Sequence, residues 1–153
     1  MPIFVFLHVL SMFTAVALAY GPAAMMVVAS QRRDVRSLRA IVATAERLGP
    51  AVGAAFATGI VLGVISIFVH GFDPLLGWLV IAYILVAISI GMTVFFTNPW
   101  LRKVAAAAEA SPDDQMSADL RALVEAPSVL WVNVLDGVLW LAIIYLMVVK
   151  PFD

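Results

Sequence analysis

Few side chains in this sequence could do chemistry, and the most informative of them lie within long apolar stretches. Asp136 is the only carboxylate well inside such a stretch, and Asn133 precedes it by three residues, so both share one helix face. Tyr20 is expected at a similar depth in the first apolar stretch. Asp136 either relays a proton or binds a cation, or it hydrogen-bonds Asn133, Tyr20 or backbone and fixes helix packing. A single carboxylate favours the packing role, because proton paths usually contain several titratable groups in series.

The two histidines, His8 and His70, form a second candidate site. They are expected near the same end of the first two apolar stretches, with His70 about one helical turn closer to the surface. Two histidines from facing helices are a common way to hold a b-type heme, so heme b is the cofactor that this pair suggests. The alternatives are a structural hydrogen bond for His8 and an interfacial position for His70.

Several kinds of chemistry have no candidate residues. The chain contains no cysteine, which excludes disulfides, thiolate metal sites and cysteine nucleophiles. Phosphate-binding glycine loops, HExxH and the nucleophile elbow are also missing from the sequence. We therefore predict no catalytic residues and no metal site, and an enzyme is the less favoured class.

Composition identifies the surroundings in which these residues act. Of the 153 residues, 64% are hydrophobic and 12% are charged, whereas soluble proteins average about 45–50% and about 25%. The mean hydropathy is +1.07. These values predict an integral membrane protein and exclude a disordered chain, a soluble enzyme and a nucleic-acid binder.

Four stretches are long enough to cross a bilayer as helices, near residues 3–28, 50–70, 75–96 and 129–149. Backbone groups in lipid must bond internally, so the predicted fold is an all-α bundle of four transmembrane helices, forming one domain over residues 1–153. Residues 31–48 are expected to be helical as an extension of the first span. Residues 117–125 are expected to form a short amphipathic helix on the membrane surface.

Basic residues are concentrated in the segments that follow the first and third spans, which contain all of the nine lysines and arginines except Lys150. The positive-inside rule places these segments in the cytoplasm. Both termini are then on the outer, periplasmic side of a bacterial cytoplasmic membrane.

Small residues recur at helical spacing in the middle spans. Gly59-x-x-x-Gly63 is the close-packing motif of membrane helices, and Ala87-x-x-x-Gly91 repeats it in the third span. These residues serve either packing within the bundle or docking of a partner helix.

Two short segments resemble a known group of proteins. Phe6-Leu7-His8-Val9-Leu10 and the ending Tyr145-Leu146-Met147-Val148-Val149-Lys150-Pro151 resemble an uncharacterised four-helix family of bacterial integral membrane proteins. That family is distantly similar to copper-resistance D-type proteins and to membrane heme-binding protoporphyrinogen oxidases. The resemblance implies that His8 is a heme ligand, and it supplies no match for a second ligand.

Three functions remain for the chain. The favoured one is a non-enzymatic accessory or structural subunit that contacts lipid and packs against other membrane subunits or a second copy of itself. The first alternative is a b-type heme protein that transfers electrons or handles porphyrin. The second is a small proton or ion transporter that uses Asp136.

Overall fold

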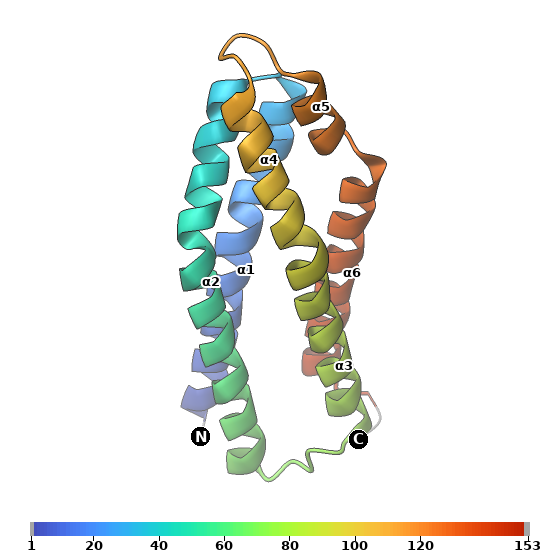
Figure 1. Ribbon diagram of the computed structural model, residues 1–153. Helices are drawn as coiled ribbons and strands as arrows, with labels where there is room; N and C mark the ends of the chain where they lie inside the picture. Colours follow the sequence, from blue (N-terminus) through green and yellow to red (C-terminus); the bar gives the residue numbers. More distant parts are fainter. Residues whose placement is uncertain (1, 152–153) are drawn as a thin grey trace.

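The computed structural model describes residues 2–151, which form six α-helices and one π-helical turn without a strand in that range (Figure 1). The elements in chain order are α1 (Pro2–Gln31), α2 (Val35–His70), α3 (Gly77–Met92), η1 (Thr93–Thr97), α4 (Asn98–Ala110), α5 (Ala118–Val124) and α6 (Pro127–Val149). Helices α3, η1 and α4 follow one another without a break. The all-α prediction is confirmed.

Four helical segments in residues 2–151 are long and apolar enough to cross a membrane. Helix α1 packs along α2, and α3 packs along α6, so the bundle consists of two helix pairs. The two ends of the described chain lie at the same end of the bundle, opposite the α1–α2 turn (Figure 1). The protein is therefore a multi-pass integral membrane protein in contact with lipid.

The helix expected as an extension of the first span belongs to the second one. The chain reverses at Arg33, which has a left-handed φ of 54°. Asp34 then begins α2 as its N-cap, because its carboxylate accepts a hydrogen bond from the Ser37 backbone N–H at 3.0 Å. Helix α2 runs on through Pro50 to His70, so the predicted span 50–70 is only its apolar part.

The basic end of the molecule has its own core. We call residues 32–46 and 102–125 the basic cap. Leu38, Val104 and Leu120 are fully buried there, against the end of α1. The prediction that 117–125 lies on the membrane surface is wrong in this respect, because Leu120 faces this core and no lipid.

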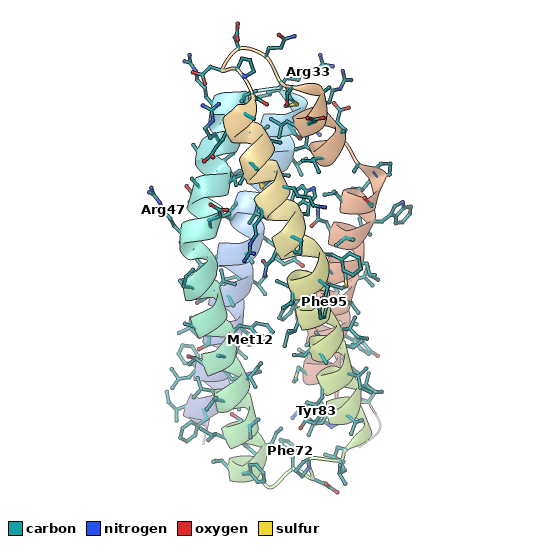
Figure 2. All side chains as sticks on the ribbon, viewed as in Figure 1. Met12, Arg33, Arg47, Phe72, Tyr83 and Phe95 are labelled. Carbon is teal, nitrogen blue, oxygen red and sulfur yellow. The ribbon has the colours of Figure 1, made fainter. Side chains whose placement is uncertain are left out.

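Charged side chains on the surface of the basic cap connect α2 to the end of α4. The Arg39 guanidinium donates to the carbonyl oxygens of Ala108 and Ser111 and to Asp113, at 2.8–3.2 Å. These bonds satisfy carbonyls at the end of α4 that have no partner within the helix. The hydrogen bond from Arg39 and the charge of Arg36 lower the pKa of Asp113 below its usual value. Figure 2 shows Arg33 at this end and Phe72 at the other.

Candidate functional site

The carboxylate of Asp136 joins three helices. The Tyr20 hydroxyl on α1 donates to one carboxylate oxygen, and the Ser89 hydroxyl on α3 donates to the other at 2.7 Å. Ser89 is buried, with 4% of its surface exposed. Both oxygens of Asp136 are thus hydrogen-bonded inside the protein. We call Tyr20, Ser89 and Asp136 the polar lock.

The polar lock connects the two helix pairs. The Ser89–Asp136 bond lies within the α3–α6 pair, whereas Tyr20 reaches Asp136 from the other pair. Within residues 2–151, α1 and α6 share little close backbone contact, so this side-chain bond is a main link between them. Measured hydrogen bonds between membrane helices average about 0.6 kcal/mol and reach about 1.7 kcal/mol.

The structure brings together two of the three residues that the sequence suggested for this site. Asn133 does not join Tyr20 and Asp136, although it lies one turn from Asp136 on α6. Its side chain makes no hydrogen bond within the described residues and lines a separate cavity. Sequence reasoning missed Ser89, whose signal was that it is the only serine of the third span.

His8 lies between α1 and α2 against the glycine motif. Its Nδ1 is 2.7 Å from the Gly59 carbonyl oxygen, which accepts the Nδ1 proton. A Cβ added to Gly63 would lie 2.9 Å from that Nδ1, and one added to Gly59 would lie 2.5 Å from the Met12 sulfur. The motif Gly59-x-x-x-Gly63 therefore serves packing inside the α1–α2 pair.

His70 occupies a different place from His8. It ends α2, its Nδ1 lies 2.8 Å from the Ser66 carbonyl oxygen, and its ring stacks on Phe72 at 6.2 Å. Gly63, which contacts His8, is seven residues earlier, or about 10 Å along the helix axis. The structure does not bring the two imidazoles together. Within residues 2–151, no three histidine or acidic side chains gather as metal ligands either.

An aromatic cluster closes the end opposite the basic cap. Phe72 and Trp78 meet edge to face at 5.9 Å, and Trp78 is buried with 3% exposed. The Lys150 ammonium group lies 4.5 Å from the centre of the Phe72 ring and 5.7 Å from that of Trp78. These cation–π contacts attach the end of α6 to the α2–α3 connection.

Comparison with known proteins gives a family. Residues 2–151 match the family described as "Predicted integral membrane protein (DUF2269)". The match covers nearly the whole chain, so the protein belongs to this family. No curated protein and no solved structure matches the chain.

Proposed function

We propose that the protein is a non-enzymatic accessory subunit that docks against another membrane protein through the face of α3 containing Ala87 and Gly91. The observation that carries this proposal is the open space at Gly91, where an added Cβ would meet nothing within 4 Å. Ala87, one turn earlier, is exposed. Gly59 and Gly63 of α2 are covered from within the bundle by Met12 and His8, but this second small-residue face is not.

The polar lock supports a structural role for the intramembrane carboxylate. An ion or proton path needs a group that exchanges its partners, whereas Asp136 accepts a hydrogen bond on each oxygen from Tyr20 and Ser89. This geometry favours helix packing over transport as the role of Asp136.

Chemical cross-linking in membranes, followed by purification in mild detergent, tests the docking proposal. We expect a cross-linked species containing a partner, which Gly91→Leu removes because the larger side chain separates the two backbones. Ala54→Leu is the matched control, since Ala54 is also exposed but lies on α2. A clean monomer, or equal loss in both variants, contradicts the proposal. Mass spectrometry then distinguishes a second copy from a different protein.

A second candidate function, b-type heme binding, is favoured by the orientation of His8. Donation of the Nδ1 proton to Gly59 leaves Nε2 as the ring nitrogen able to bind a metal. The described residues supply this one oriented imidazole and place no second histidine beside it. A visible spectrum of the purified protein, oxidised and then reduced, tests the idea. A Soret band lost in His8→Ala supports it, and a colourless sample contradicts it.

We also propose that the basic cap lies in the cytoplasm of a bacterial cell and that both termini lie outside. The cap contains most of the chain's arginines, which the positive-inside rule places in the cytoplasm. Alkaline phosphatase fused after Asp153 is expected to be active, and the same enzyme inserted between Asp113 and Asp114 inactive. The reverse pattern overturns the orientation.

A further inference from the structure

A cavity of about 110 Å³ lies between the two helix pairs, on the basic-cap side of the polar lock. Its wall includes Ala19 and Ser30 of α1, Thr97 of η1, and Asn133 of α6. On α1 the lining extends from Ala19 to Ser30, or about 16 Å along the helix axis. The cavity therefore runs from next to Tyr20 to the underside of the basic cap.

Two polar side chains in the lining of this cavity, the half-buried Thr97 of η1 and the exposed Asn133 of α6, have no protein partner within the described residues. The Asn133 amide and the Thr97 hydroxyl make no hydrogen bond within residues 2–151. An amide exposed to hydrocarbon without a partner is costly, because nothing in lipid replaces its hydrogen bonds to water. Water in the cavity would supply those partners.

Water meets both the volume and the chemistry of this site. At about 30 Å³ for each molecule, the cavity accommodates about three waters. Asn133 offers two donors and an acceptor, and Thr97 offers one of each. Thr97 also ends a π-helical turn, a feature that often occurs at functional sites.

We propose that this cavity is a water-filled vestibule that opens toward the basic cap and is held by Asn133 and Thr97. Its inner end lies within one helical turn of both Tyr20 and Asp136. The aqueous phase on the basic side thereby reaches the neighbourhood of the polar lock, while the aromatic cluster lies at the other end of the bundle. The proposal does not depend on a docking partner.

Cysteine accessibility tests the vestibule directly, because the natural chain has no cysteine. Asn133→Cys and Ala19→Cys place a thiol in the cavity wall. Leu135→Cys, at a similar depth of α6, places one at an exposed position that does not line the cavity. Asp114→Cys, in the exposed loop of the cap, marks the basic side. Each variant is studied in sealed vesicles of either orientation. One reagent is a charged methanethiosulfonate, which does not cross membranes and so reports the side of access. The other is silver ion, which is smaller and can enter a narrower cavity.

We expect Asn133→Cys and Ala19→Cys to react from the same side as Asp114→Cys, at least about tenfold faster than Leu135→Cys, since only a hydrated thiol ionises. Adding Ala23→Phe, which fills the cavity, slows the reaction at Asn133→Cys. If Asn133→Cys fails to fold, Ala19→Cys carries the test. No reaction at either position with Asp114→Cys labelled shows that lipid or a partner fills the space and overturns the proposal. Reaction from the opposite side, or equal reaction of Leu135→Cys, also overturns it.

Discussion

The carboxylate of Asp136 depends on neutral donors alone, which determines how its substitutions behave. Asp136→Asn keeps one acceptor oxygen for Tyr20 or Ser89, whereas Asp136→Leu leaves both hydroxyls without an acceptor. We expect Asp136→Leu to reduce the free energy of unfolding by about 1–3 kcal/mol, and Asp136→Asn by less. Thermal unfolding in detergent measures both. Equal losses would show that charge, and not hydrogen bonding, is what Asp136 contributes.

Gly63 tests the contact between His8 and α2. In Gly63→Ala the new methyl group lies 2.9 Å from His8 Nδ1, so the imidazole must leave its bond to Gly59. We expect a loss of about 1–3 kcal/mol in unfolding free energy, as for other overpacked sites. In a His8→Ala background the same substitution should cost little. Gly91→Ala, with open space around it, is the control and is expected to be neutral or to stabilise by up to about 1 kcal/mol. Persistence of the Gly63→Ala loss without His8 would refute the contact.

Acid affects the ion pairs of the basic cap in a defined direction. The pKa of Asp113 is lowered by Arg39 and Arg36 from an ordinary value of 3.8. A lowered pKa means that the ionised form stabilises the fold above pH 3.8, and that this contribution disappears as the pH falls through the lowered value. The difference in melting temperature between the natural protein and Asp113→Asn should therefore be constant near neutral pH and vanish below pH 3.8.

The comparison with Asp113→Asn also separates the contribution of Asp113 to stability from that of Asp34. The pKa of Asp34 is likewise lowered, by its hydrogen bonds to Ser37, so it titrates in the same acid range. Both proteins retain Asp34, and its contribution cancels in the difference. A melting-temperature difference that stays constant down to the most acidic pH would contradict the Asp113 ion pair.

At the scale of elements, hydropathy predicts what lies in lipid and little of what lies beyond it. The four spans follow from apolar runs, and residues 2–151 contain four helices long and apolar enough to cross a membrane, although the third begins at Gly77 and not at Leu75. The extension of α2 to Val35 has no such signal, because its first turns alternate charged residues with the buried Val35, Leu38 and Val42, which pack against protein. Its start was readable in another way, since Asp34 three residues before Ser37 is a typical N-cap arrangement.

Helix α5 shows why an amphipathic pattern alone did not predict what the apolar side of a helix contacts. An apolar stripe does not reveal whether it faces lipid or protein. Leu120 is fully buried, and its helix α5 packs against α4 and the end of α1. We expect Leu120→Ala to cost about 2–5 kcal/mol in unfolding free energy and to expose residues 111–117 to proteases. Leu123→Ala, at a half-buried position of α5, should cost less. If both substitutions have equal and small effects, Leu120 is not part of a packed core, and the prediction that α5 lies on the membrane surface is favoured instead.

For the candidate site, the sequence could predict how deep each residue lies along its helix but not in which direction its side chain points. Tyr20 and Asp136 were placed at the same level by counting turns, and the structure joins them. Counting did not show which way a side chain points around its helix axis. For that reason Asn133 was grouped with Asp136, Ser89 was missed, and His8 was paired with His70. The positions of Asn133 and Ser89 depend on how α6 and α3 are rotated about their own axes, whereas His8 and His70 are separated along the α1–α2 pair.

At the scale of the whole molecule, the two helix pairs are connected at three levels. The basic cap joins α2 to α4, the polar lock joins α1 to α6, and the Lys150 contacts join α6 to the α2–α3 connection. Polar or charged groups take part in each connection. Apolar contacts also join the pairs, because Ile67 of α2 lies in one buried cluster with Leu79 of α3 and Leu146 of α6, and Phe56 of α2 meets Trp140 of α6 edge to face. Helix association in lipid has no hydrophobic driving force, so polar connections and close side-chain packing together hold the pairs.

The separation of Tyr20 and Asp136 by 116 residues also has a consequence for biosynthesis. At about 5–20 residues per second, a ribosome needs about 6–23 s to make that stretch. During this interval the α1–α2 hairpin is already synthesised, and the Tyr20 hydroxyl has no Asp136 carboxylate to which it can donate. The His8–Gly59 bond, separated by only 51 residues, becomes available earlier. The order of synthesis thus lets the α1–α2 hairpin assemble first, and the last helix to emerge completes the polar lock.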